Sequence, residues 1–122
     1  MSGNGKTYCG IDIVEISRVR QAIKRNPAFL NKIFTASELN GNLGVPSLAA
    51  RFAAKEASMK ALGTGMFRTR WKEIEVLNDE TGRPYLKLHG AALRQSRNLQ
   101  IMGFSVSLSH CLSYAAAIVI SF

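Results

Sequence analysis

The sequence predicts an α+β fold in which a mainly antiparallel sheet packs against one long helix. The strand and helix patterns follow one another in the order β-α-α-β-β-α-β-β. Two strand patterns, 71–77 and 85–88, are joined by a turn and indicate a hairpin. The helical pattern at 47–62 is long, and Gly63 stands where a glycine commonly ends a helix.

Size and composition indicate an ordinary globular protein. The chain has 122 residues, of which 47% are hydrophobic and 20% are charged, and it has no repeat or low-complexity segment. A chain of this length can bury one core of real size. We therefore expect a single domain over 1–122, with flexibility only at 1–7.

The first half of the chain predicts a strand followed by helices. The run 8–16 is rich in β-branched residues, and its alternation places Asp12 on the face opposite the neighbouring isoleucines. Ser17 is a candidate N-cap for a helix that ends at Arg25. Two further helical segments are expected, at 27–34 and at 35–38, the second with the spacing of a capping box.

The second half adds a helix and two strands to the hairpin. A helix is expected at 91–100, and the pattern at 104–109 alternates as a strand should, with His110 at its end. The last run, 113–122, consists largely of small and β-branched residues. It predicts a strand that is buried on both faces or lies at a subunit contact.

The charge balance is less ordinary than the composition. Sixteen Lys and Arg residues oppose eight Asp and Glu residues, which gives a formal net charge of +8. Such an excess attracts polyanions, so nucleic acid, phosphorylated small molecules, acidic proteins and anionic membranes are all candidate partners. Charge alone does not choose among them.

The cysteines and the chain ends indicate a cytoplasmic protein. Cys9 and Cys111 stand among apolar neighbours without a CxxC spacing, which predicts buried free thiols in a reducing compartment. The start lacks the apolar stretch of a secretory signal, and the apolar run near the end is shorter than the ~20 residues of a spanning helix. We expect no membrane partner.

The long helix carries polar side chains on two flanks. At ~100° per residue, Arg51, Lys55 and Ser58 group on one flank, which we expect to face solvent. Glu56 and Lys60 lie on the other flank and are ringed by alanines. They are either an ordinary i,i+4 ion pair or a functional pair, because small neighbours leave room for a ligand to approach.

Asp12 is a second unusual acid. A carboxylate between isoleucines on a strand is costly to bury without a partner. It either has a structural partner or ligates a metal. If Asp12 and Glu56 meet, two oxygen ligands without clustered Cys or His favour Mg²⁺, which fills its other positions with water and substrate phosphate.

Five motifs, in this order along the chain, are similar to those of one enzyme family. They are GIDIVEI at 10–16, FTASEL at 34–39, RFAAKEASMKALGTG at 51–65, NDETGRPYLKLHG at 78–90 and SLSHCLSYAAAIV at 107–119. The third contains the family's most diagnostic pattern, K-E-x-x-x-K-A-L-G. From Gly10 nearly to the C-terminus, the chain resembles the bacterial holo-[acyl-carrier-protein] synthase group of 4′-phosphopantetheinyl transferases.

The resemblance implies transfer of the 4′-phosphopantetheine arm of coenzyme A to a serine of apo acyl carrier protein, with release of adenosine 3′,5′-bisphosphate, in support of fatty acid biosynthesis. It implies that Asp12 and Glu56 hold Mg²⁺ together with the pyrophosphate of coenzyme A. Lys60 would contact that phosphate, so these three residues are the expected catalytic group. The residues expected at the coenzyme A site are Lys60, Gly63, Gly65, Arg51, Pro84 and His110.

The resemblance also implies protein partners. The family's first helix docks acidic carrier proteins through arginines, which indicates Arg18, with Arg20, Lys24 and Arg25 as further candidates. The other interpretation of this helix is a solvated basic face. Subunits of the family usually form a trimer with active sites at the subunit boundaries, and the apolar last strand suits such a contact.

One departure and two competing functions remain. Cys111 stands where many family members have Asp after the histidine, so the group that orients His110 is open. A coenzyme A-binding protein without transferase activity would share most of these features. A small nucleic-acid-binding domain would fit the basic helix, but such domains usually have exposed aromatic residues among the basic ones. This interpretation also leaves Asp12 and Glu56 unexplained. We therefore expect no nucleic acid partner.

Overall fold

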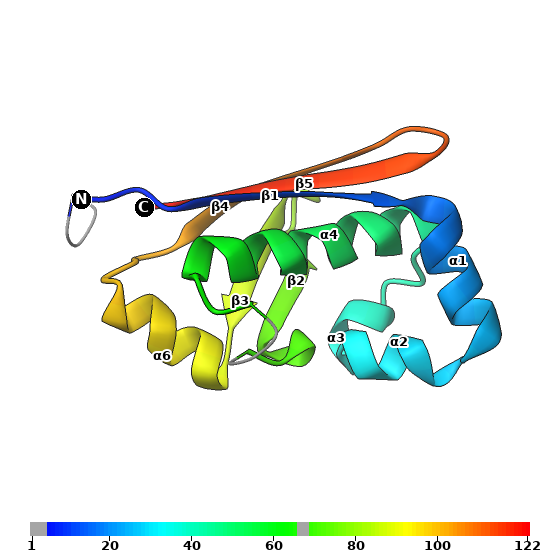
Figure 1. The fold of residues 1–122 in the computed structure, drawn as a ribbon, viewed down its shortest axis with the longest axis horizontal. Helices are drawn as coiled ribbons and strands as arrows, with labels where there is room; N and C mark the ends of the chain where they lie inside the picture. The colour runs from blue at the N-terminus through cyan, green and yellow to red at the C-terminus, as the bar shows by residue number, and fades with distance from the viewer. Residues whose placement is uncertain (1–4, 66–68) are drawn as a thin grey trace.

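The computed structural model describes residues 5–65 and 69–122, and its α+β class and antiparallel pairing confirm the prediction (Figure 1). The strands are β1 (Cys9–Glu15), β2 (Ile74–Asn78), β3 (Pro84–Leu88), β4 (Phe104–His110) and β5 (Tyr114–Ser121). The helices are α1 (Ile16–Arg25), α2 (Ala28–Ile33), α3 (Ala36–Leu39), α4 (Val45–Leu62) and α6 (Gly90–Asn98), with a 3₁₀ turn, η1 (Trp71–Glu73). Of the segment expected to be flexible, 1–7, residues 1–4 lie outside the described part.

A three-stranded antiparallel sheet forms one layer of the molecule, along the top of Figure 1. Its strand order is β1-β5-β4, so the last strand lies between the first and the fourth. The register pairs Asp12 with Ala117, and His110 with Ala115 at the far end of β4. The position of Asp12 therefore depends on the C-terminal strand as well as on its own.

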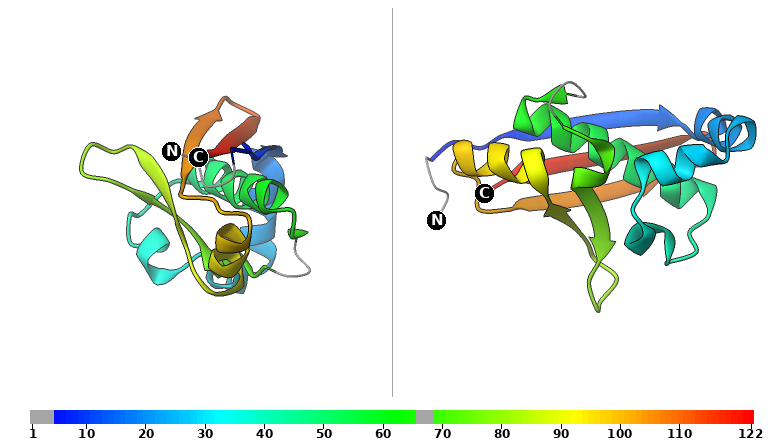
Figure 2. Two further views of the ribbon diagram at one scale, coloured as in Figure 1. Left: turned by 90° about the vertical axis from the view of Figure 1, so that its left-hand side faces the viewer. Right: turned by 90° about the horizontal axis from the view of Figure 1, so that it is seen from below.

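The hairpin predicted from 71–88 is confirmed, but it is a separate two-stranded sheet, β2-β3, and not part of one continuous sheet. β3 approaches β4 without joining its ladder. The hairpin instead covers another flank of α4, where Ile74 and Val76 are buried (Figure 2). Packing against the helix thus outweighs the extension of the sheet.

The contact between α4 and the three-stranded sheet is made of small residues. Ala49, Ala53 and Ala57 are fully buried, and they pack with residues of β1 and β5. A Cβ atom on Gly10 of β1 would overlap the carbonyl oxygen of Ala57. The expectation that these alanines leave room for a ligand was therefore wrong, because their small size lets the helix and the sheet approach each other.

The flank of α4 that we expected to face solvent is buried. Lys55 and Ser58 have no exposed surface, and Arg51 is 8% exposed. The Ser58 hydroxyl donates to the carbonyl oxygen of Ala54 at 2.6 Å, and Arg51 donates to Oδ1 of Asn78 at 2.7 Å. A helical wheel does not distinguish a solvated polar flank from one covered by another element, which is why the prediction failed.

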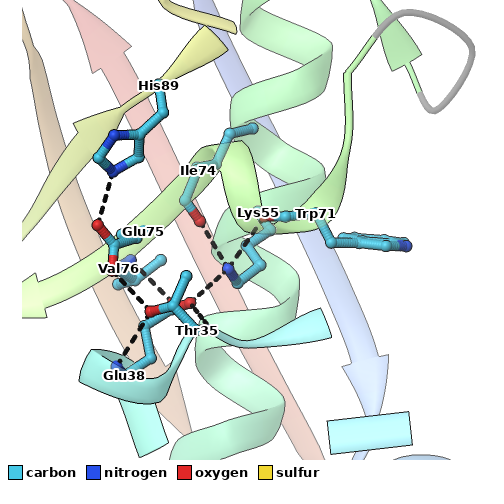
Figure 3. Close-up of polar contacts among 8 residues, drawn as sticks. All are labelled: Thr35, Glu38, Lys55, Trp71, Ile74, Glu75, Val76 and His89. Carbon is cyan, nitrogen blue, oxygen red and sulfur yellow. Dashed lines mark hydrogen bonds and ion pairs between the residues drawn. The ribbon is translucent and has the colours of Figure 1, made fainter. Parts of the chain in front are cut away.

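A buried ion pair ties α4 to α3 and to the hairpin (Figure 3). Nζ of Lys55 donates to Oε1 of Glu38 at 2.8 Å, and to the carbonyl oxygens of Ile74 at 2.6 Å and Trp71 at 3.1 Å. The second carboxylate oxygen of Glu38 accepts from the backbone N–H of Val76 at 2.9 Å. Burial lowers the pKa of Lys55, and the charge of Glu38 opposes that shift. Both ions are thus held by full sets of partners.

Helix ends follow the predicted chemistry in α3 and α4 and depart from it in α1. Thr35 and Glu38 form the expected capping box, and Gly63 ends α4 in the left-handed conformation. Helix α1 begins at Ile16, so Ser17 is not its N-cap. Among the described residues, no helix has the length and apolar character needed to cross a bilayer.

Two further local predictions need correction. Residues 71–73 form the 3₁₀ turn η1 and not the start of a strand, and the carbonyl oxygen of Trp71 accepts from Lys55 and from the backbone N–H that closes the turn. Cys9 and Cys111 are free, as expected, but both are exposed. Cys9 lies on the outer face of β1 and Cys111 follows the end of β4, where the chain turns.

The face of the three-stranded sheet that points away from α4 is open and apolar. Ile11 and Ile13 are 65% and 66% exposed, and Ile118 and Ile120 of β5 are exposed beside them. The register places Ile11 opposite Ile118. β5 is therefore buried on one face only in the single chain, where the prediction allowed burial on both.

We predict that Lys55→Met lowers the free energy of unfolding by about 3–5 kcal/mol, because it leaves the Glu38 carboxylate buried without its cation. Urea denaturation at one protein concentration measures the change. Lys24→Met, at an exposed lysine of α1, is the matched control. A loss equal to that of the control would contradict the role given to the ion pair.

Candidate active site

Asp12 and Glu56 meet between β1 and α4, as the family resemblance implied. Asp12 points toward the helix because Ile11 and Ile13 occupy the open face of the sheet. Glu56 points toward β1 because Ala53 and Ala57 fix the rotation of α4 against it. Both carboxylates are partly buried.

The electrostatics of this pair make a second carboxylate charge costly. Burial raises the pKa of Glu56, and the charge of Asp12 and a hydrogen bond with it raise that pKa further. Lys60 opposes the shift. Nζ of Lys60 donates to Oδ1 of Asp12 at 3.2 Å and to the carbonyl oxygen of Ile11 at 2.9 Å. The described residues show no ion pair between Glu56 and Lys60, so the i,i+4 interpretation is wrong: the lysine pairs across to the strand.

A cavity of about 490 Å³ opens on the two carboxylates. Its other lining residues are Ile13, Val14, Glu15, Arg18, Phe52 and Tyr114. Sequence reasoning placed Arg18 near the site only through the family resemblance, and it missed Glu15 and Tyr114. Glu15 is the last acid of the GIDIVEI motif, which was the available signal, whereas Tyr114 comes from the far end of the chain through its pairing with Glu15.

The donor set fits a magnesium ion held by few protein ligands. Asp12 and Glu56 supply hard carboxylate oxygens, and their mutual repulsion is the kind that a bound cation relieves. Within residues 5–65 and 69–122, no three His, Cys, Asp or Glu side chains gather as a metal cluster. Two ligands would leave most positions for water and substrate oxygens, as is common for Mg²⁺.

The chain beyond Lys60 leaves open space next to the site. Gly63 and Gly65 both have positive φ values, 73° and 57°, and apart from their chain neighbours no atom of the described residues lies within 4 Å of where a Cβ would stand on either. A side chain at these positions would be strained as well as exposed. That the glycines border a ligand stays a prediction, because neither lines the cavity of Asp12 and Glu56.

Three other residues predicted at the coenzyme A site lie in a different place. Pro84 lines a second cavity, of about 440 Å³, together with Asn78 and residues of β4. Arg51 donates to Asn78, a lining residue of that cavity, but is itself 8% exposed and not part of the lining. His110 is exposed at the end of β4, on the strand face shared by Leu108. The predicted residues thus form two groups in the single chain.

The basic side chains of α1 are exposed, as predicted, but they do not share one side. Arg18 lines the cavity of Asp12 and Glu56. At ~100° per residue, Arg25 lies close to the direction of Arg18, while Arg20 and Lys24 lie on the opposite flank. Ile16 and Val19 are buried between the two flanks. Helix geometry therefore favours Arg18 and Arg25 over the other two as neighbours of the cavity.

Comparison with known proteins decides the family. A model of the 4′-phosphopantetheinyl transferase superfamily matches residues 8–119. The chain belongs to the 4′-phosphopantetheinyl transferase superfamily. Within it, the chain is an enzyme of the holo-[acyl-carrier-protein] synthase group, as the resemblance of the five motifs implied.

Its relatives in this superfamily match over nearly their whole length. A holo-[acyl-carrier-protein] synthase of Moorella thermoacetica is 50% identical over 113 residues, which cover 89% of this chain and 88% of the relative. The Helicobacter pylori synthase in complex with coenzyme A superposes with a TM-score of 0.85 at 30% identity, covering 93% of this chain and 99% of that one. The Neisseria meningitidis synthase has the same TM-score at 33% identity, covering 94% and 97%.

The raised pKa of Glu56 gives a prediction for the metal-free protein. The folded chain binds a proton on the Glu56 carboxylate more tightly than the unfolded chain does. The stabilisation of the fold by this proton is therefore complete below pH 4.5, the ordinary pKa of the group, and is lost as the pH rises through the raised pKa. Glu56→Gln, which cannot ionise, should unfold at higher urea concentration than the parent above that pKa. The difference should vanish at acid pH.

Urea denaturation in the presence of a chelator, repeated across the pH range, measures this difference. Glu80→Gln, at an exposed acid, is the matched control. A Glu56→Gln variant that is less stable than the parent at alkaline pH would show that the ionised Glu56 carboxylate does not destabilise the folded chain, and would contradict the prediction.

Proposed function

We propose that the chain transfers the 4′-phosphopantetheine group of coenzyme A to a serine of an apo acyl carrier protein, in a Mg²⁺-dependent reaction that supports fatty acid biosynthesis in the cytoplasm. The observation that carries this proposal is the convergence of Asp12, Glu56 and Lys60 at a cavity, in an enzyme of this family. The name of the relatives gives the carrier protein as substrate, and the complex of the Helicobacter pylori synthase supports coenzyme A as donor.

Asp12 and Glu56 would hold the metal ion, which supplies positive charge at the pyrophosphate of coenzyme A when bound. Lys60 is already held at Asp12 and lies one helical turn beyond Glu56. Its ammonium can contact the same phosphate and offset the charge that develops as the bond breaks. The protein thus contributes mainly position and electrostatics.

In the reaction itself, the serine oxygen forms a bond to the β-phosphorus and the bond from that phosphorus to the bridging oxygen breaks. The leaving group is adenosine 3′,5′-bisphosphate, and the serine proton must pass to a base. Glu56 is one candidate, because its carboxylate lines the cavity in which the reaction would take place. A water ordered at the metal is the other.

The two groups of predicted residues support an assembly with shared sites. Asp12 and Glu56 line one cavity, and Lys60 is paired with Asp12. Pro84 lines another cavity together with Asn78, which accepts a hydrogen bond from Arg51, and His110 lies at the end of β4, two residues beyond Leu108 of that lining. We propose that one subunit's first group and a neighbour's second group together bind coenzyme A, in a homotrimer. The open apolar face of Ile11, Ile13, Ile118 and Ile120 supports a subunit contact there.

The chain, coenzyme A, Mg²⁺ and apo carrier protein together should give a carrier heavier by one phosphopantetheine group, measured by mass spectrometry. Glu56→Gln should remain folded and lose the activity. An unmodified carrier at high enzyme concentration would favour the alternative, a coenzyme A-binding protein without transferase activity. Near-normal turnover of Glu56→Gln would instead remove Glu56 from the proposed metal site.

Arg18 borders the catalytic cavity from α1, and carrier proteins are acidic, so we propose that it docks the carrier. Arg18→Glu should raise the KM for the carrier about tenfold and leave coenzyme A binding nearly unchanged. Arg97→Glu makes the same charge change at an exposed residue of α6 and is the control. An equal loss of affinity for the carrier protein and for coenzyme A in Arg18→Glu would contradict the docking role.

A further inference from the structure

A third cavity, of about 460 Å³, shares no lining residue with the two described above. It is formed by η1, by α2 and by the residue that precedes α6. Its lining residues include Lys32, Arg70, Trp71, Lys72, Glu73 and His89. None of these residues has a part in the reaction proposed for the catalytic cavity.

The lining of this cavity has more cationic side chains than acidic ones. Lys32, Arg70 and Lys72 are exposed, and none of them makes an ion pair in the described part of the chain. The carboxylate of Glu73 is already engaged, because it accepts from the backbone N–H groups of Arg70 and Ala91. Three cations against this one carboxylate leave a positive excess, which favours an anionic ligand such as a phosphate group.

A histidine in the lining is positioned by a buried carboxylate (Figure 3). Nε2 of His89 lies 2.6 Å from Oε1 of Glu75, whose side chain is only 10% exposed. The other oxygen of Glu75 accepts from the hydroxyl of Thr35 at 2.6 Å, so the carboxylate itself is fixed. The second ring nitrogen of His89 has no partner among the described residues. A carboxylate that orients a histidine in this way is typical of imidazoles that contact ligands.

The cavity also contains an aromatic surface. Trp71 lines it and stacks on Phe52 with ring centroids 4.9 Å apart. His89 lines the same cavity. Aromatic rings of ligands gain stacking energy from such a surface. Positive charge and an indole ring together favour an occupant with both a phosphate and a ring.

We propose that this cavity is a second ligand site, which binds a small molecule of the nucleoside phosphate class. The phosphate contacts the side chains of Arg70, Lys72 and His89, and the base packs against Trp71. This binding requires neither coenzyme A nor carrier protein, so it goes beyond the proposed transferase reaction and stands or falls independently of it.

The chain has one tryptophan, Trp71, so intrinsic fluorescence reports directly on the cavity. Titration of the enzyme with adenosine 5′-monophosphate, without coenzyme A or metal, should change the emission in a saturable way. Ribose 5-phosphate, which lacks the ring, and adenosine, which lacks the phosphate, should each bind at least about tenfold more weakly. Equal affinity for adenosine would overturn the phosphate contact, and equal affinity for ribose 5-phosphate would overturn the ring contact.

Variants decide where the nucleotide binds. The double variant Arg70→Glu, Lys72→Glu should weaken nucleotide binding by about tenfold or more. His89→Ala should also weaken nucleotide binding, and calorimetry measures it in place of fluorescence. Arg97→Glu, which lies away from this cavity, should bind as the parent does. Phe52 lines the catalytic cavity, so a ligand there could also change the emission. Binding that is lost in Lys60→Ala but survives Arg70→Glu would place the nucleotide in the catalytic cavity and overturn the proposal.

Discussion

The close packing of α4 on β1 is the constraint on which the geometry of Asp12, Glu56 and Lys60 depends. Gly10 lacks a side chain where one would meet the carbonyl of Ala57, so strand and helix backbones come into direct contact. At that separation Asp12 and Glu56 are neighbours, and Lys60 reaches the strand. A larger residue at the contact would move the helix outward and separate the carboxylates. The two acids are therefore brought together by backbone packing, not by attraction between them.

The second constraint acts on the opposite flank of α4. The buried pair of Lys55 and Glu38 joins the helix to α3, to η1 and to β2, with each charge compensated by several hydrogen bonds. Buried pairs of this kind add little net stability compared with apolar residues, but they are specific about which elements meet. The sheet holds one side of α4 and this network holds the other. Glu56 consequently stands on a helix whose rotation is fixed from both sides.

Periodicity and motifs predicted the elements and the pairing of Asp12 with Glu56, and the family motifs predicted the class of enzyme. What they could not provide were relations between segments far apart in the sequence. Lys55 looks like a solvated lysine on a wheel, because its partner lies on a different helix. Tyr114 reaches the cavity only through the strand order β1-β5-β4, which no local pattern encodes. The alanines were noticed correctly and explained wrongly, since a small side chain serves close packing as well as ligand access.

The distribution of charge sharpens the case for a cation at the site. The chain carries a net charge of +8, yet the catalytic cavity is lined by three acids, Asp12, Glu15 and Glu56, against one arginine, Arg18. The ammonium of Lys60 is already shared with Asp12. A pyrophosphate entering this cavity would meet carboxylates first, and repulsion at such distances is strong where burial limits screening. The local excess of negative charge therefore favours the binding of a further cation together with a phosphorylated substrate, and this is the role in which we propose Mg²⁺.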